Sequence, residues 1–155
     1  MIPPSPMNKN LVLRYLREIL DYQDEDFVKM LTLMDVKVTF EELSSWLKAE
    51  GEEGYIELSD KMLAFFLESL ILLKRGKGDA AEARTLEFPV TNNLVLKKLR
   101  IAFELKEEDI VNVMAKSAQS VSPKEWSPYF RSKKHKHFRK CPDAFLEAFL
   151  KGLVP

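Results

Sequence analysis

Apolar residues recur every three or four positions along this chain, which places them on one face of an α-helix, and no segment has convincing strand alternation. Three segments carry a one-sided apolar stripe, and a fourth, Met62–Leu73, is apolar nearly all round. The pattern predicts four helices, of which the last is the most buried. The stripes are Val12, Tyr15, Leu16, Ile19 and Leu20, then Phe27, Met30, Leu31 and Met34, then Leu43, Trp46 and Leu47.

The same pattern occurs a second time in the chain. A shift of 83 positions pairs Asn10–Leu70 with Asn93–Leu153 without a gap, and 17 of the 61 pairs are identical. A further 13 pairs place one apolar residue opposite another. A repeat of this kind indicates duplication of one structural unit. We therefore predict an all-α protein made of two homologous four-helix units in tandem.

Local signals in the sequence set the predicted boundaries. Thr39 with Glu42, and Ser122 with Glu125, have the capping-box spacing that begins a helix. Gly76 follows two basic residues and is suited to end the fourth helix of the first copy. The predicted organisation is a flexible tail at residues 1–7, an acidic unit at 8–75, a linker at 76–90 and a basic unit at 91–155.

Three stretches of the sequence resemble a known family. They are "NNLVLKKLRIAFELKEEDI", "FLESLILLKRGK" and "HKHFRKCPDAFLEAFLKGL". They look like the YehS-like family of bacterial proteins, which carry tandem domains of unknown function. The resemblance covers nearly the whole chain after the first seven residues. It implies a duplicated, all-helical, cytoplasmic protein, and it implies no functional residues because the family has no established activity.

The two copies differ most in charge. The net charge is zero, but residues 8–73 hold 7 Lys/Arg against 14 Asp/Glu, whereas residues 91–155 hold 13 against 7. The difference is largest before the fourth helix, where "KAEGEEGYIE" spans Lys48–Glu57 and "RSKKHKHFRK" spans Arg131–Lys140. Packing of a shared fold does not require this reversal. The charged loops are therefore predicted to contact partners.

A protein partner or self-association is the favoured expectation for these loops. The acidic loop of one chain can meet the basic loop of another, and the two loops can also meet within one chain. The candidate partner-binding residues are Glu50, Glu52, Glu53 and Glu57 in the acidic loop, and Arg131, Lys133, Lys134, His135, Lys136, His137, Arg139 and Lys140 in the basic loop.

Nucleic acid is the alternative partner of the basic loop. Its cations can meet phosphates, and Phe138 supplies a ring on which a base can stack. The longest apolar run, Met62–Leu73, is shorter than the roughly 20 residues that cross a membrane, so no membrane partner is predicted.

Metal binding and catalysis are not favoured by the sequence. His135, His137, Cys141 and Asp143 include zinc-ligand types, but the surrounding cations repel a divalent ion. We predict no metal and no cofactor. The chain also lacks a glycine-rich phosphate loop, a serine nucleophile motif and paired catalytic carboxylates, so we predict that it is not an enzyme.

Cys141 is the single cysteine, which fits a reducing, cytoplasmic compartment. Nearby cations and a helix start after Pro142 are features that lower a thiol pKa. Its counterpart in the first copy, however, is the apolar Leu58. A buried and inert thiol is the favoured interpretation.

Two duplicated pairs of opposite charge complete the candidates. Arg17 with Asp26, and Arg100 with Asp109, are predicted to form structural ion pairs between the first and second helices of each unit. The alternative interpretation makes them twin ligand sites, one in each copy.

Overall fold

The computed structural model describes residues 7–76, 86–117 and 122–155, and every regular element within these ranges is helical. The predicted all-α tandem repeat is confirmed. The predicted linker, apart from Gly76 and residues 86–90, and the predicted tail, apart from Met7, lie outside the described residues.

The first unit contains α1 (Lys9–Leu20), α2 (Asp24–Leu31), the 3-10 helix η1 (Thr32–Met34), α3 (Phe40–Leu47) and α4 (Asp60–Arg75). The second contains α5 (Asn92–Ala102), α6 (Glu107–Ala115), α7 (Pro123–Trp126), the 3-10 helix η3 (Ser127–Phe130) and α8 (Asp143–Leu153).

The two predicted capping boxes have different outcomes. In α3, the Glu42 N–H donates to Thr39 Oγ1 over 3.0 Å and the Thr39 N–H donates to Glu42 Oε1 over 3.0 Å, as predicted. In α7, the Ser122 side chain makes no cap hydrogen bond and contacts Glu125 Oε1 at 3.5 Å, so the second box is wrong. Helix α7 is a single turn that begins at Pro123, whose missing N–H removes one of the donors that a cap would satisfy.

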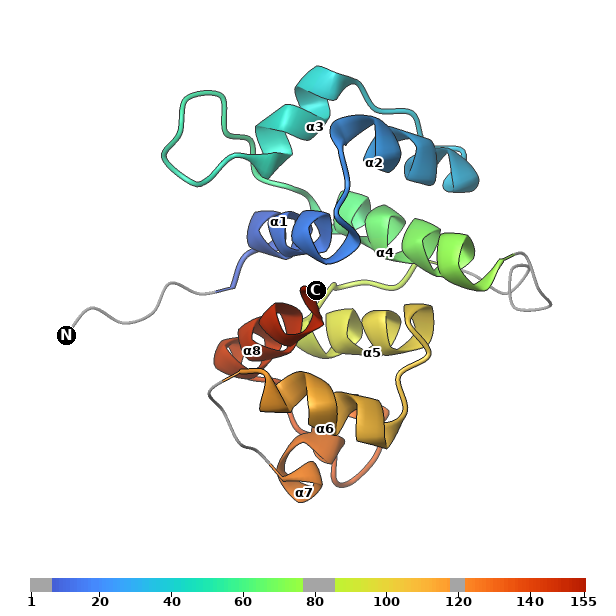
Figure 1. Ribbon diagram of the computed structural model, residues 1–155, viewed down its shortest axis with the longest axis vertical. Helices are drawn as coiled ribbons and strands as arrows, with labels where there is room; N and C mark the ends of the chain where they lie inside the picture. The colour runs from blue at the N-terminus through green and yellow to red at the C-terminus, as the bar shows by residue number, and fades with distance from the viewer. Residues whose placement is uncertain (1–6, 77–85, 118–121) are drawn as a thin grey trace.

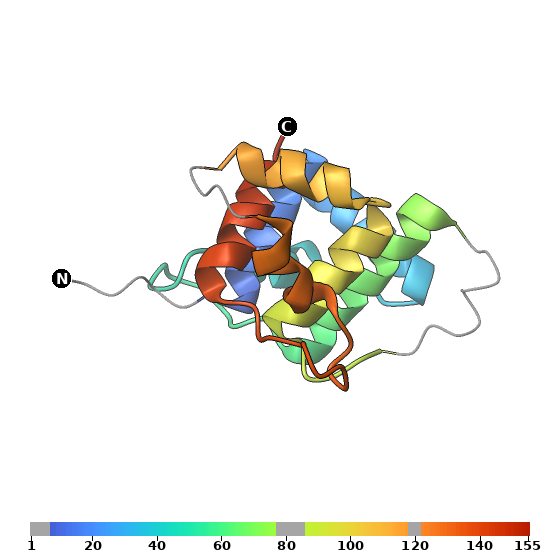
Figure 2. The same ribbon diagram turned by 90° about the horizontal axis from the view of Figure 1, so that it is seen from below.

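The two units pack face to face through four helices. Helices α1 and α4 lie against α5 and α8, while α2 and α3 cover the outer side of the first unit and α6 and α7 that of the second (Figures 1 and 2). The contacts between units join α4 to α5 and α1 to α8. In the internal repeat, α1 corresponds to α5 and α4 corresponds to α8. Exchanging the two units therefore turns the α4–α5 contact into the α8–α1 contact. This is the arrangement produced by an approximate twofold axis.

Buried apolar side chains of both units form one continuous core. In the first unit, Phe66 lies edge-to-face with both Phe27 and Trp46. In the second unit, Tyr129 packs edge-to-face on Phe145 at a ring distance of 5.0 Å. Each fully buried aromatic or aliphatic side chain contributes roughly 1.5–3 kcal/mol through the hydrophobic effect. The units therefore stabilise each other and are not two independent bodies on a linker.

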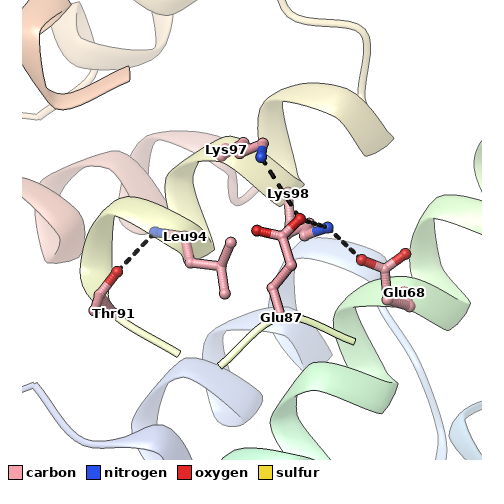
Figure 3. A network of polar contacts seen from close by, with 6 residues as sticks. All are labelled: Glu68, Glu87, Thr91, Leu94, Lys97 and Lys98. Atoms are coloured by element: carbon pink, nitrogen blue, oxygen red, sulfur yellow. Dashed lines mark hydrogen bonds and ion pairs between the residues drawn. The ribbon is translucent and has the colours of Figure 1, made fainter. Parts of the chain in front are cut away.

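A buried ion-pair network crosses the contact between α4 and α5. The Lys98 ammonium contacts the Glu68 carboxylate and lies 3.0 Å from Glu87 Oε1, and the Lys97 ammonium lies 3.6 Å from the same oxygen (Figure 3). Lys98 is 8% exposed and Glu68 is 2% exposed. Charges this deeply buried are tolerated because they are paired. The network also holds the segment at residues 86–90 beside the start of α5.

The acids of the two predicted Arg–Asp pairs have a different role. Asp26 Oδ2 accepts a hydrogen bond of 2.8 Å from the Gln23 N–H, and Asp109 Oδ2 accepts one of 2.8 Å from the Lys106 N–H. Each carboxylate thus satisfies a backbone donor at the N-terminus of its own helix, where the helix dipole also favours negative charge.

Among the described residues, neither arginine of these pairs forms an ion pair with its predicted acid. Arg100 Nε donates to Leu105 O over 3.0 Å, and its guanidinium lies 5.1 Å from the centre of the Phe130 ring. Arg17 is exposed and forms no ion pair with any described residue. Each acid accepts its hydrogen bond from a backbone N–H only three residues earlier in the chain, whereas the predicted arginine lies farther away in sequence, on the preceding helix. The predicted ion pairs Arg17–Asp26 and Arg100–Asp109 are therefore wrong.

Candidate functional site

One buried asparagine holds the acidic loop (residues 48–57) in place. The side chain of Asn10 on α1 is 1% exposed. Its amide donates to Trp46 O over 3.0 Å and to Ile56 O over 2.9 Å, and its Oδ1 accepts from the Leu58 N–H over 3.0 Å and from the Tyr55 hydroxyl over 3.1 Å. Asn10 therefore fixes the loop backbone on both sides of its charged residues.

The basic loop (residues 131–140) has the same anchor. The Asn93 amide donates to Tyr129 O over 3.0 Å and to Arg139 O over 2.8 Å, and its Oδ1 accepts from the Cys141 N–H over 2.9 Å. These three partners are the repeat counterparts of Trp46, Ile56 and Leu58. The two loops are thus held alike and differ in the charges that they carry.

Sequence reasoning missed the anchoring role of these asparagines. In the sequence, Asn10 and Asn93 are simply an identical pair at the start of the aligned repeat. The available signal was a polar side chain, present in both copies, directly before the apolar run of an amphipathic helix. Such a residue is buried only when its hydrogen bonds are satisfied, and a loop backbone is the common source of partners.

The predicted partner-binding residues of both loops are exposed. Among the described residues, no ion pair joins the acidic loop to the basic loop, so the halves of the chain close through helices and not through these charges. The exposed predicted residues are Glu50, Glu52, Glu53 and Glu57, and Arg131, Lys133, Lys134, His135, Lys136, His137, Arg139 and Lys140.

The histidines of the basic loop shape its turn. The His137 N–H donates to His135 Nδ1 over 3.0 Å, and Arg131 Nη1 lies 3.4 Å from His135 Nε2. Both rings are exposed, whereas the Cys141 side chain is buried at the end of the loop. In the described ranges, no group of three or more His, Cys, Asp or Glu side chains is arranged to hold a metal ion.

A groove of about 880 Å³ lies between the basic loop, the start of α5 and residues 86–90. Phe88 in its wall is 54% exposed. Burial acts to raise the pKa of Glu87, but the hydrogen bond and charge of Lys98, together with Lys97, hold this pKa below its usual value. The groove combines cations and aromatic rings, namely Lys97, Arg131, Lys133 and Lys140 with Phe88, Tyr129, Phe130 and Phe138.

A family model described as "Protein of unknown function (DUF1456)" matches residues 9–76 and again residues 92–155. The chain belongs to the DUF1456 family. It is 44% identical over 148 residues to the uncharacterized protein YehS of Escherichia coli (strain K12), and the alignment covers 96% of this chain and 95% of YehS. No solved structure matches significantly. The resemblance found in the sequence is thereby confirmed.

The two DUF1456 matches coincide with the two helical units. One unit of the family is accordingly α1–α4 or α5–α8, including the loop that the asparagine anchors. Within the part of the chain that the structure describes, no helix has the length and apolar character needed to cross a membrane.

Cys141 in the second DUF1456 unit is predicted to react slowly with thiol reagents. It is 6% exposed, and burial, with a further contribution from Asp143, raises its pKa to about 12. Ionisation alone should slow its reaction with DTNB at pH 8 by about a thousandfold relative to the unfolded chain, because the thiolate is the nucleophile. The rate is measured by absorbance with and without denaturant, and similar rates in both would contradict the prediction.

The free energy of unfolding should also depend on pH through the proton of the Cys141 thiol. The folded protein holds the Cys141 proton more tightly than the unfolded chain does, because the folded pKa is about 12 and the ordinary value is 9.0. This contribution to stability is complete below the unfolded pKa and is lost as pH rises from there through the folded pKa.

Proposed function

We propose that this DUF1456 protein is a non-enzymatic, cytoplasmic binding or adaptor protein that contacts other polypeptides through its two charged loops. The observation that carries the proposal is the pair of equivalent asparagine anchors, which hold loops of opposite charge. Because the two loops are anchored in the same way, folding does not account for their opposite charges. We attribute the difference in charge to the partners that the loops contact. The single, buried cysteine supports the assignment to a reducing compartment.

A second copy of the chain is the simplest partner with complementary charge. The acidic loop of one molecule would meet the basic loop of the next, in a head-to-tail contact. Exposed ion pairs of this kind are screened by salt, since the Debye length falls from about 30 Å at 0.01 M to about 10 Å at 0.1 M. The association should therefore be strongest at low ionic strength.

Nucleic-acid binding through residues 131–140 is the second candidate function. The groove beside the basic loop favours it, because exposed Phe88 and half-buried Phe138 offer stacking surfaces next to Lys133 and Lys140. Single-stranded nucleic acid is recognised by this combination of aromatic faces and cations.

Charge reversal in the basic loop separates the two candidates. The variant carries Lys133→Glu, Lys134→Glu and Lys136→Glu, three exposed changes that leave the Asn93 anchor intact. Light scattering should show a mass above the monomer for the wild type at low salt, and a monomer for the variant. A wild-type mass that stays monomeric from low to high salt would contradict contact between chains.

Titration with labelled single-stranded DNA and RNA tests the alternative. If about three phosphates are neutralised, raising salt from about 50 mM to about 200 mM weakens binding about 20-fold. The alternative is rejected if no salt-sensitive binding appears, or if the three substitutions leave binding unchanged. The control variant carries Glu50→Lys, Glu52→Lys and Glu53→Lys, which should remove self-association without weakening nucleic-acid binding.

A further inference from the structure

A pocket of about 370 Å³ lies between α7, the 3-10 helix η3 and the basic loop. It is distinct from the larger groove beside residues 86–90, with which it shares only Arg131 and Phe138. Most of the residues that line it carry a hydrogen-bond donor in the side chain. They are Lys124, Ser127, Arg131, Lys136, His137 and Arg139.

One wall of the pocket is a helical face. Lys124, Ser127 and Arg131 follow one another at spacings of three and four residues across α7 and η3, which places them on the same side of a helix. Glu125 lies outside this series. Its carboxylate contacts the Ser122 hydroxyl at 3.5 Å and does not line the pocket. This wall is therefore cationic.

The other wall is the end of the basic loop, which folds back onto η3. The N–H groups of Arg131 and Arg139 both donate to Pro128 O, over 3.4 and 3.3 Å. The Asn93 amide also binds the Arg139 carbonyl, over 2.8 Å. The backbones of both arginines are thus held by the protein itself, so a ligand does not have to supply the free energy of ordering them.

No acid balances the cations of this pocket. None of the residues that line it is Asp or Glu. Within the part of the chain that the structure describes, none of its lysines and arginines forms an ion pair. Asp143, the next acid along the chain, accepts a hydrogen bond of 2.7 Å from the Asn92 amide. The pocket therefore holds four Lys/Arg charges without an internal counterion.

Hydrogen bonding at His135, beside the pocket, also favours an anion. His135 Nδ1 accepts from the His137 N–H over 3.0 Å, so the proton of the neutral ring is on Nε2. Arg131 Nη1 lies 3.4 Å from that Nε2, which places two donors next to each other. An anion bound between them can accept hydrogen bonds from both.

The first unit does not carry this charge. Of the counterparts of the four Lys/Arg positions, one is basic, two are acidic and one is apolar. They are Lys48, Glu41, Glu53 and Ile56. One cation and two acids give −1, against +4 in the second unit. Lys48 Nζ donates to the Glu53 carbonyl over 3.0 Å, so the loop itself holds the one cation. The shared fold therefore does not account for the cationic pocket.

We infer that this pocket binds the dianionic group of a phosphate monoester, either a small phosphorylated molecule or a phosphorylated side chain of a partner polypeptide. A carboxylate or a phosphodiester brings one negative charge, whereas a phosphate monoester brings nearly two and three acceptor oxygens. The planar guanidiniums of Arg131 and Arg139 can each bind two such oxygens. The inference rests on the proposed function in placing ligand contact at the basic loop.

Inorganic phosphate is the first probe. It is titrated into the full-length, ¹⁵N-labelled protein at about pH 7.5, where phosphate is mainly dianionic, and at constant ionic strength. The NMR signals of the Ser127, Arg131, His137 and Arg139 amides should shift and saturate. Acetate at the same ionic strength should bind at least about tenfold more weakly.

Two substitutions in the same loop test the pocket. Arg139→Gln removes one exposed cation and leaves the backbone bonds to Pro128 and Asn93 intact, and it should weaken phosphate binding at least about tenfold. Lys134→Gln is the matched control. It removes the same charge from the same loop, but Lys134 does not line the pocket, so the affinity should change less than about twofold.

Two further probes identify the source of the phosphate. A capped tripeptide with phosphoserine between two glycines should bind more tightly than inorganic phosphate if the ligand is a phosphorylated side chain. Equal binding of the two assigns the pocket to small phosphorylated molecules. A single-stranded oligonucleotide without a terminal phosphate should bind more weakly than both.

Four outcomes would overturn the inference. They are the absence of saturable shifts at millimolar phosphate, equal binding of acetate and phosphate, equal losses in Arg139→Gln and Lys134→Gln, and tightest binding by the oligonucleotide. The variant with Glu50→Lys, Glu52→Lys and Glu53→Lys keeps the pocket and should bind phosphate as the wild type does. Light scattering tests the contact between loops and the phosphate titration tests the pocket, so their failures are distinguishable.

Discussion

Lys98→Met is expected to lower the free energy of unfolding by about 3–5 kcal/mol, because it leaves a buried carboxylate without its cation. Glu68 is 2% exposed and pairs with Lys98 across the contact between α4 and α5. Methionine matches the length of the lysine stem, so the loss reports the charge rather than the volume. The change also releases Glu87, which holds residues 86–90 against α5.

Urea unfolding followed by far-UV circular dichroism measures this loss. Lys97→Met is the matched control, since Lys97 meets the same Glu87 oxygen at 3.6 Å but has a half-exposed side chain. It should cost less than about 1 kcal/mol, as exposed pairs do. Adding Glu68→Leu to Lys98→Met should restore most of the stability. If the two lysine variants were equally stable, the buried network would not be the cause.

Asn10→Ala is expected to cost about 3 kcal/mol, since it removes the partners of Trp46 O, Ile56 O and the Leu58 N–H together. Each buried polar group left without a partner costs about 1–3 kcal/mol, and the losses within one loop overlap. Asn93→Ala should cost roughly half as much, because Arg139 is exposed and water can replace the lost donor at its carbonyl.

Thermal unfolding of the two alanine variants tests this ranking. A substitution to Asp serves as a second variant, since Asp keeps the acceptor but loses both donors, and it should be destabilising at both positions. Equal effects of Asn10→Ala and Asn93→Ala would contradict the proposed dependence on burial. Loss of the acidic loop's amide protection in Asn10→Ala, with protection of the basic loop retained, would locate the damage at the anchored loop.

The helical architecture was predictable because buried apolar residues recur every three or four positions in the sequence. Residues such as Leu16 and Leu99, identical in both copies, are fully buried in the same core. The Arg–Asp pairs were not predictable from spacing, because an acid three residues after a helix N-cap has a nearer partner in the capping N–H. The aspartates therefore accept hydrogen bonds from backbone N–H groups of their own helices and do not form the predicted ion pairs with the arginines.

The polar contact between units was equally hidden. Lys98 and Glu68 correspond to Tyr15 and Lys151, so the repeat gives no sign that they form a pair. The charged loops could be found by comparing the copies, because the reversal of charge is visible in the aligned sequence and the charged residues are exposed in the structure. The neighbouring groove was not found, because Phe88 and Lys97 come from segments distant in sequence from the basic loop.

The exchange of contacts between the units has an evolutionary consequence. A single unit able to make both contacts would pair with its own copy as a symmetric dimer, in which each surface is duplicated on the partner. Both loops of that dimer would necessarily bear the same charge, because one gene would encode them. Joining the copies in one chain removes this constraint. One loop was then free to become acidic and the other basic.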